Sequence, residues 1–281
     1  MNSKSVLITG CSSGIGQHVA LALQARGYRV FASARKAADV AALAAQGLES
    51  LQLDLDDSTS IQAAVREVLA RTDGQLFALV NNAGYGQAGA VEDLRRAVIR
   101  AQFETNLFGP LELTNLIVPV MRAQGYGRII NISSLLGLAV LPYRGAYNAS
   151  KFALEGLTDT LRLELRDTGI LVSLIEPGPI ISRFRSNSFI TYQQNIDPER
   201  SAHRKNYLAM ERRLTQPGPV APFTLTPQAV QDKLVHALEH PRPKLRYYVT
   251  FPTHLAAALR RILPYRALDW VLYRISGGGK A

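Results

Sequence analysis

Short apolar runs alternate with amphipathic segments over the first two-thirds of the chain. The apolar runs predict strands at residues 6–9, 30–34, 50–53, 76–81, 128–132 and 171–175. The amphipathic segments predict helices at residues 15–26, 37–46, 58–71, 103–122 and 147–167. Because continuously apolar strands suit a parallel sheet that is covered on both faces, this alternation predicts a doubly wound α/β fold.

The pattern loosens after residue 182. Residues 183–225 are polar and basic and predict a long excursion, or lid. A helix is predicted to follow Thr226, its N-cap, and a last strand is predicted at residues 245–250. Residues 254–275 then carry apolar side chains at helical spacing.

These boundaries predict one Rossmann-type catalytic domain over residues 1–250, with about seven strands and a lid at about 183–225. Residues 251–281 are predicted to form an amphipathic C-terminal extension. With 281 residues, the chain is long enough to bury a sizeable core.

Composition excludes several classes of protein. The chain is 47% hydrophobic, which excludes a disordered protein, and its single cysteine excludes a disulfide framework or a cysteine-rich zinc site. The histidines lack metal-ligand spacing, so no metal is predicted. No apolar run reaches the roughly 18 residues that cross a bilayer, and no secretion signal is evident at the N-terminus, so a cytoplasmic location is expected.

The net charge of +10 is unevenly distributed. Residues 183–281 contain 16 Lys or Arg and 6 Asp or Glu, so the whole surplus lies there, and residues 1–182 are neutral. A basic region favours an acidic partner such as a lipid surface or a phosphorylated ligand. No recognition-helix or RNA-binding motif accompanies the charge, so nucleic acid is not the expected partner.

A glycine-rich turn lies between the first predicted strand and the first predicted helix. Glycines allow a pyrophosphate to approach the backbone, and the following helix would present free N–H groups to that anion. The alternative is a tight strand–helix turn without a ligand, since the spacing differs from Gly-x-Gly-x-x-Gly. The predicted cofactor-binding residues of the turn are Gly10, Ser12, Ser13, Gly14, Ile15 and Gly16.

The end of the second predicted strand indicates which nicotinamide cofactor is used. An acidic residue there would bind the ribose 2′-hydroxyl of NAD, but the strand ends at Ala34 and is followed by Arg35 and Lys36. An arginine can bind a phosphate through two hydrogen bonds and a lysine adds a point charge, so these residues favour NADP(H). Ordinary surface charge is the alternative interpretation.

Tyr147 and Lys151 are four residues apart and therefore share one helix face. A free tyrosine has a pKa near 10, too high for efficient proton transfer at neutral pH. We expect the neighbouring ammonium, aided by an oxidised nicotinamide, to lower the pKa of Tyr147, which would then exchange a proton with a carbonyl or alcohol oxygen. A solvated helix face is the alternative.

Several short motifs over residues 5–182 occur together in the order found in one family. They are Thr9-Gly10-x-x-x-Gly14-Ile15-Gly16, Asp54-Leu55, Asn81-Asn82-Ala83-Gly84, Asn106, Ser134, Tyr147-x-x-x-Lys151 and Pro177-Gly178. The chain strongly resembles the short-chain dehydrogenases/reductases. Within that family it is most similar to the 17β-hydroxysteroid and retinol dehydrogenase branch, and its ending resembles that of a bacterial NADP-dependent aldehyde reductase.

The resemblance implies roles for individual residues. It implies that Ser134 orients the substrate oxygen and that Asn106 holds a water linking Lys151 to solvent. It further implies cofactor contacts for Tyr147 and for these residues: Asp54, Leu55, Asn82, Ala83, Gly84, Lys151, Pro177, Gly178, Ile180 and Ser182. The family more often has threonine where Ser182 stands, and the hydroxyl is retained.

The expected function is NADP(H)-dependent hydride transfer involving a hydrophobic aldehyde, ketone or alcohol, with Tyr147 as general acid/base, since relatives of this branch act on such compounds. The alternative is a non-catalytic NADP(H) sensor or a membrane-associated regulatory protein. Residues 254–275 could lie on anionic lipid at the inner face of the membrane, or could close the substrate pocket or form a dimer contact. A homo-oligomer is also expected.

Overall fold

The computed structural model describes residues 4–277 and contains a seven-stranded sheet in the order β3-β2-β1-β4-β5-β6-β7, in which every pairing is parallel. Reversal of the strand order between β1 and β4 creates a switch point where parallel α/β sheets bind ligands. The strands are β1 (Ser5–Ile8), β2 (Arg29–Ala34), β3 (Glu49–Gln52), β4 (Ala78–Asn81), β5 (Gly127–Ile132), β6 (Ile170–Glu176) and β7 (Arg246–Tyr248).

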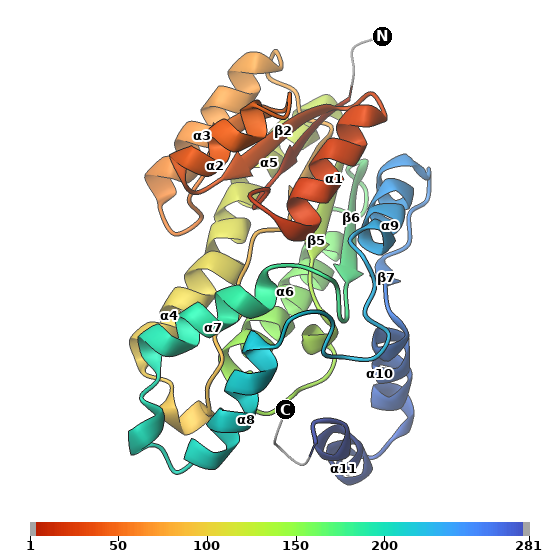
Figure 1. Cartoon of the computed structure of the whole chain (residues 1–281). Helices are drawn as coiled ribbons and strands as arrows, with labels where there is room; N and C mark the ends of the chain where they lie inside the picture. Colours follow the sequence, from red (N-terminus) through yellow and green to blue (C-terminus); the bar gives the residue numbers. More distant parts are fainter. Residues whose placement is uncertain (1–3, 278–281) are drawn as a thin grey trace.

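Helices cover both faces of the sheet, as Figure 1 shows. The first six are α1 (Gly14–Ala25), α2 (Ala37–Ala44), α3 (Ser58–Arg71), α4 (Arg96–Phe103), α5 (Gly109–Gln124) and α6 (Gly145–Glu164). The remaining five are α7 (Phe184–Asn195), α8 (Arg204–Thr215), α9 (Gln228–Glu239), α10 (Phe251–Ile262) and α11 (Tyr265–Ile275). A π-helical turn, Glu104–Phe108, joins α4 to α5.

The core forms two layers because the strands are apolar on both faces. On one face α1, α2 and α9 bury Leu23, Leu43 and Leu234 against the sheet. On the other face α3, α5 and α6 bury a second set that includes Ile117 and Leu165. The predicted doubly wound fold and its seven strands are therefore confirmed.

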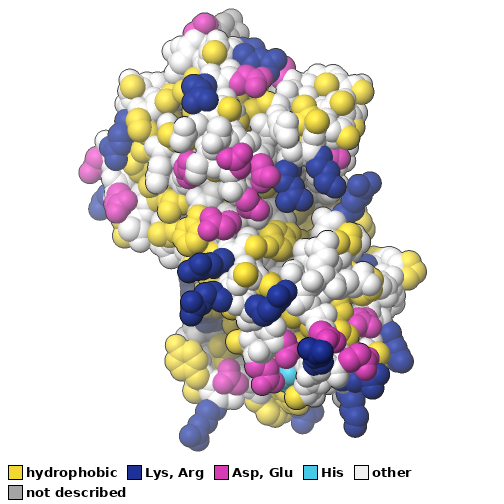
Figure 2. All heavy atoms as spheres, turned by 90° about the vertical axis from the view of Figure 1, so that its left-hand side faces the viewer, with side chains coloured by type: hydrophobic (Ala, Val, Ile, Leu, Met, Phe, Trp, Pro, Cys, Tyr) yellow, Lys and Arg dark blue, Asp and Glu magenta, His cyan; other side chains and the backbone are white. Residues whose placement is uncertain are grey.

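Residues 183–225, the predicted lid, contain α7 and α8 and a loop that ends at Leu225. The two helices pack on α4 and the start of α6 through a small separate core, in which Tyr192, Tyr207 and Met210 are fully buried. They lie with α10 and α11 beyond the carboxyl ends of the strands, in the lower half of Figure 1. Figure 2 shows the molecule narrowing between its two halves, with basic side chains gathered across that narrow part.

The structure differs from the predicted boundaries at several elements. The helix expected at residues 103–122 begins earlier, because α4 and the π turn run directly into α5. The last strand is limited to Arg246–Tyr248, and α9 begins at Gln228 with Pro227, not Thr226, at the N-cap position. None of the helices between residues 4 and 277 is long and apolar enough to span a bilayer.

Candidate active site

The glycine turn follows β1. At each of its three glycines, Gly10, Gly14 and Gly16, a larger residue would be strained or would clash. Gly10 and Gly14 have positive φ angles of 71° and 60°, where a side chain would be strained. Gly16 has ordinary geometry, but a Cβ there would lie 2.4 Å from the carbonyl oxygen of Gly10 and 2.5 Å from the Asn82 Nδ2 atom. The turn therefore brings bare backbone close to the carboxyl end of β4.

Thr9 and Asn82 hold this turn against the end of β4. The Thr9 hydroxyl accepts hydrogen bonds of 3.0 Å from the backbone N–H groups of Asn82 and Ala83. The Asn82 side chain donates to the carbonyl oxygens of Thr9 and Gly10 at 2.9 and 3.1 Å. Asn82 thus supports the turn, while Ser13, the N-cap of α1, makes no side-chain capping bond, which leaves the first N–H groups of α1 open to an anion.

The residues expected around the adenosine end follow β2 and β3, the two strands on one side of β1. Arg35 and Lys36 follow β2, are exposed, and form no ion pair with any residue between 4 and 277. Leu55 is buried, and the Asp54 carboxylate accepts a 3.1 Å hydrogen bond from the backbone of Asp56.

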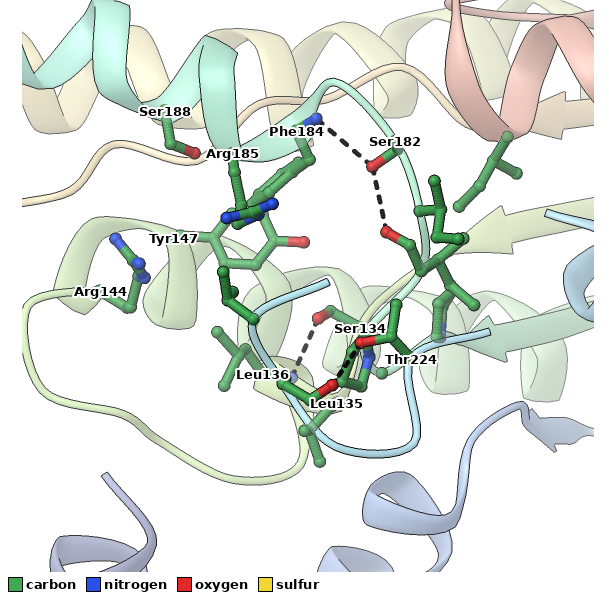
Figure 3. Close-up of a pocket in the computed structure, with 18 of the residues that line it drawn as sticks. Ser134, Leu135, Leu136, Arg144, Tyr147, Ser182, Phe184, Arg185, Ser188 and Thr224 are labelled. Carbon is green, nitrogen blue, oxygen red and sulfur yellow. Dashed lines mark hydrogen bonds between the residues drawn. The ribbon is translucent and has the colours of Figure 1, made fainter. Parts of the chain in front are cut away.

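Tyr147 lies in the first turn of α6 and is buried, with 7% of its surface exposed. The ring of Phe184, at the start of α7, contacts the Tyr147 ring edge-on with centroids 5.1 Å apart. Figure 3 shows the Tyr147 hydroxyl pointing away from Arg144 and into the cavity that Ser134 also lines. The Ser134 hydroxyl caps the following turn by accepting a 3.1 Å bond from the backbone of Leu136.

Burial dominates the ionisation of both Tyr147 and Lys151. It raises the pKa of Tyr147 to about 12, although a hydrogen bond with Ser134 and the charge of Arg144 act in the opposite direction. Burial lowers the pKa of Lys151 to about 8, against the opposing influence of Glu155. In the protein without cofactor the pKa of Tyr147 is therefore raised, because the desolvation of the phenolate outweighs the nearby charges. The expected lowering by Lys151 together with an oxidised nicotinamide stays a prediction.

Asn106 lies in the π-helical turn and connects the loop after β4 to α6. Its side chain donates to the Tyr85 carbonyl oxygen at 2.9 Å and to the Ser150 hydroxyl at 3.1 Å, and it accepts a 3.1 Å bond from the Tyr85 N–H. A Cβ on Gly84 would lie 3.1 Å from the Asn106 Oδ1 atom and 3.8 Å from the Lys151 Nζ atom. The structure thus brings Asn106, Gly84 and Lys151, which belong to three separate motifs, close together.

The segment that follows β6 forms the floor of a cavity of about 440 Å³ in front of Tyr147. Pro177, Gly178, Ile180 and Ser182 all line this cavity. Gly178 packs tightly on the start of α10, because a Cβ there would meet the Thr250 hydroxyl. The loop after α8 borders this floor, because Leu225 exchanges backbone hydrogen bonds of 3.1 and 2.9 Å with residues 179 and 181.

A buried charge cluster lies behind Lys151. The Arg246 guanidinium, on β7, donates hydrogen bonds to the carboxyl groups of Glu155 on α6 and of Glu176 at the end of β6, the latter at 2.6 Å. Burial and the neighbouring Glu155 carboxylate raise the pKa of Glu176 to about 8. Within residues 4–277, no three His, Cys, Asp or Glu side chains are grouped so that they could hold a metal ion.

Comparison with known proteins identifies the family. The sequence profile of the short chain dehydrogenase family matches residues 4–193. The chain belongs to the short chain dehydrogenases. It is 44% identical to "Uncharacterized oxidoreductase YbbO" of Escherichia coli K12 over 269 residues, which is 96% of this chain and 94% of that protein.

Two further likenesses bear on this short chain dehydrogenase. Human 17-beta-hydroxysteroid dehydrogenase type 1 is 35% identical over 260 residues, which cover 87% of this chain and 77% of the human protein. A short chain dehydrogenase/reductase from Burkholderia phymatum, solved in complex with NAD, has a TM-score of 0.76 and 26% identity and covers 96% of this chain and 95% of that one. The chain is therefore an oxidoreductase of a family that uses nicotinamide cofactors.

The described residues fit a nicotinamide dinucleotide. The glycine turn leaves no room for a Cβ and the uncapped N-terminus of α1 suits the pyrophosphate, while the cavity beside Tyr147 and Lys151 is wide enough for the nicotinamide end. When bound, the nicotinamide ring supplies or accepts a hydride. Ser134 and Tyr147 both line this cavity, so each could place a hydroxyl beside a substrate oxygen there.

Sequence reasoning missed three features of this site. Phe184 packs on the Tyr147 ring, Gly178 packs on Thr250 at the N-cap of α10, and Arg144 and Arg213 line the cavity. The surplus of basic residues after residue 182 was a signal for Arg213 but not for Arg144, which precedes it, and nothing in the sequence indicated that either side chain faces the cavity.

Proposed function

We propose that the protein is an NADP(H)-dependent carbonyl reductase that acts on hydrophobic aldehydes or ketones, with the reverse oxidation of the alcohols at the same site. The observation that carries this proposal is the cavity in which Tyr147, Ser134 and Lys151 meet apolar walls formed by Leu135, Leu141 and other residues. The chain is similar to a 17-beta-hydroxysteroid dehydrogenase, and a hydroxysteroid is a hydrophobic alcohol, so this similarity supports the same substrate class.

Each group at the site has a role in the proposed reaction. Ser134 donates a hydrogen bond to the carbonyl oxygen, and Tyr147 transfers its proton to that oxygen as the hydride reaches the carbon. A protonated Tyr147 is the form needed for reduction, and a pKa of about 12 keeps it protonated at neutral pH. The Lys151 ammonium holds the ribose next to the nicotinamide ring and favours the phenolate that forms transiently.

The preference for NADP(H) rests on the end of β2. Ala34 leaves no carboxylate for the ribose 2′-hydroxyl, and the exposed Arg35 and Lys36 have no ion-pair partner among the described residues. An arginine without an internal partner is available for a 2′-phosphate.

The test follows the absorbance of NADPH with medium-chain and aromatic aldehydes, with NADH in parallel. We expect faster turnover with NADPH, and we expect Arg35→Ala to reduce kcat/KM for NADPH by about tenfold or more while changing that for NADH little. Arg66→Ala, an exposed arginine on α3, is the matched control. If NADPH binds but no carbonyl compound accelerates its loss, the protein is a sensor and the enzyme proposal fails.

We also propose that α10 and α11 contact an anionic membrane surface, a second role favoured by one observation. Their exposed side chains are large and apolar, with Ile262 76% exposed, Tyr265 85% and Trp270 60%, and Arg261 and Arg266 lie exposed among them. Such a surface could receive hydrophobic substrates directly from lipid.

Point substitutions test this contact better than truncation, because Arg260 of α10 donates to the Leu138 carbonyl oxygen beside the active site. The double variant Ile262→Glu, Trp270→Glu is expected to lose sedimentation with phosphatidylglycerol vesicles. Leu163→Glu, at a 68% exposed leucine on α6, serves as the matched control and should sediment normally. Equal sedimentation of all three proteins would contradict the membrane proposal.

A further inference from the structure

Positive charge is concentrated on one side of the substrate cavity. Arg144, Arg185 and Arg213 all line it together with Lys151, whereas no Asp or Glu among the described residues does. Arg144 is the N-cap residue of α6, and Arg185 and Arg213 come from α7 and α8 of the lid. Three separate elements therefore direct guanidinium groups to one cavity without any counter-charge.

Arg144 lacks the partner that a buried guanidinium needs. Its Nη1 atom is buried and has no hydrogen-bond partner, and its side chain forms no ion pair within residues 4–277. Burial and the nearby charge of Arg213 lower the pKa of Arg144 to about 10. A buried, unpartnered donor is costly, so its retention here points to a ligand that completes the site.

The Arg213 guanidinium also lacks a hydrogen-bond partner among the described residues, whereas the Arg185 guanidinium has several. Burial and the charge of Arg185 lower the pKa of Arg213, and no hydrogen bond from the Arg213 guanidinium to a described residue is present. The Arg185 guanidinium instead donates to the carbonyl oxygens of Arg213 at 2.8 Å and Gln216 at 3.0 Å, and also to that of Gly218. Arg185 thus fixes the end of α8, while Arg144 and Arg213 remain available to a ligand.

The cofactor phosphates do not account for these two arginines. The pyrophosphate site is the glycine turn before α1, and Arg35 and Lys36 follow β2. Figure 3 shows Arg144 on the side of the Tyr147 ring opposite the hydroxyl, with Ser182 and its segment on the hydroxyl side. The unpartnered guanidinium groups therefore line the part of the cavity next to the lid.

We propose that the substrate carries an anionic group, a carboxylate or a phosphate, which Arg144 and Arg213 bind while its carbonyl group reaches Tyr147 and Ser134. The proposal rests on the carbonyl-reductase function and narrows its substrate class to oxo compounds in which an apolar spacer separates the carbonyl from the anion. Paired guanidinium groups suit such an anion because each can donate two parallel hydrogen bonds.

Matched aldehydes test the proposal directly. We would measure kcat/KM with NADPH for 4-formylbenzoate, its neutral methyl ester and 4-formylphenyl phosphate, which share one aromatic aldehyde. We expect at least one of the two anions to be preferred over the ester by about tenfold or more. The better anion shows whether the site binds a carboxylate or a phosphate. No preference for either anion over the ester would overturn the proposal.

Substitution of Arg213 adds a matched comparison on α8. Arg213→Met is expected to lower the ratio of kcat/KM for the preferred anion to that for the ester by about tenfold to a hundredfold. Arg212→Met, at the exposed neighbouring arginine, should leave this ratio unchanged. Equal ratios in both variants would contradict a role for Arg213.

A binding measurement separates this proposal from the reductase function. In the Tyr147→Phe protein, calorimetric titration with 4-(hydroxymethyl)benzoate and 4-(hydroxymethyl)phenyl phosphate reports the anion site without turnover. Binding that is lost on adding Arg213→Met, but not Arg212→Met, would uphold the anion site even if no aldehyde were reduced. Binding that is absent, or unaffected by Arg213→Met, would overturn it even if aldehydes were reduced.

Discussion

The Lys151 ammonium donates a 2.8 Å hydrogen bond to the carbonyl oxygen of Ile132, the last residue of β5. This bond ties the catalytic face of α6 to the carboxyl end of the sheet, where Ser134 follows two residues later. Lys151 is buried, and its pKa is lowered to about 8. The positive charge of Lys151 is therefore present at neutral pH and is lost as the pH rises through about 8.

The first prediction concerns the pH dependence of reduction. The proposed reaction uses the ammonium form of Lys151, which predominates below a pKa of about 8, so kcat/KM for a neutral aldehyde with saturating NADPH should fall above pH 8. The fall should approach about tenfold per pH unit. The measurement is a pH–rate profile from pH 6 to 10.

Lys151→Arg provides the control for this profile, because a guanidinium stays charged throughout the range. Its residual activity should show no decline near pH 8. A flat profile for the natural protein, or the same inflection in the arginine variant, would argue against titration of Lys151.

The second prediction concerns stability and the buried pair of Glu155 and Glu176. Burial raises the pKa of Glu176 to about 8, above its ordinary value, so its contribution to stability is complete in acid and declines as the pH rises toward 8. Glu176→Gln, which cannot ionise, should lack this decline. Between pH 5 and 7.5 the free energy of unfolding of the natural protein should fall relative to the variant, by up to about 1.4 kcal/mol per pH unit.

Urea unfolding at several pH values measures this difference. Glu164→Gln, at an exposed glutamate on the same helix as Glu155, should follow the natural protein. A difference between Glu176→Gln and the natural protein that does not change with pH would show that Glu176 is ionised throughout this range.

The third prediction compares two glycines in helices. An added Cβ at Gly16 would lie 2.4 Å from the Gly10 carbonyl oxygen, whereas at Gly156 of α6 it would meet nothing within 4 Å. Gly16→Ala should therefore deform the glycine turn, weaken NADPH binding measured by fluorescence titration and lower the melting temperature. Gly156→Ala should leave binding intact and raise stability by about 0.5–1 kcal/mol. Unchanged NADPH affinity in Gly16→Ala would contradict the packing described for the turn.

The sequence predicted the fold and the position of the glycine turn well, because both depend on local patterns. Continuously apolar runs define parallel strands, and Gly10 and Gly14 occupy backbone conformations that only glycine adopts easily. The proximity of Tyr147 and Lys151 follows from helical spacing alone.

Other features depend on tertiary contacts and could not be predicted in this way. The expected lowering of the Tyr147 pKa considered a neighbouring charge but not the burial of the phenol, which outweighs it. Arg144 and Arg213 belong to distant parts of the chain and meet only because α8 folds back over the start of α6. The polar lid segment gave no clear periodicity, since its two helices bury only a narrow apolar stripe.

The central claim is hydride transfer to a carbonyl at Tyr147. Its most direct test is reduction of an aromatic aldehyde with NADPH carrying two deuterium atoms at C4 of the nicotinamide, followed by mass spectrometry of the alcohol. We predict that the alcohol carries deuterium on its carbinol carbon and that Tyr147→Phe forms it about 10²–10⁴-fold more slowly. An unlabelled alcohol, or equal rates for the natural protein and the variant, would contradict the account.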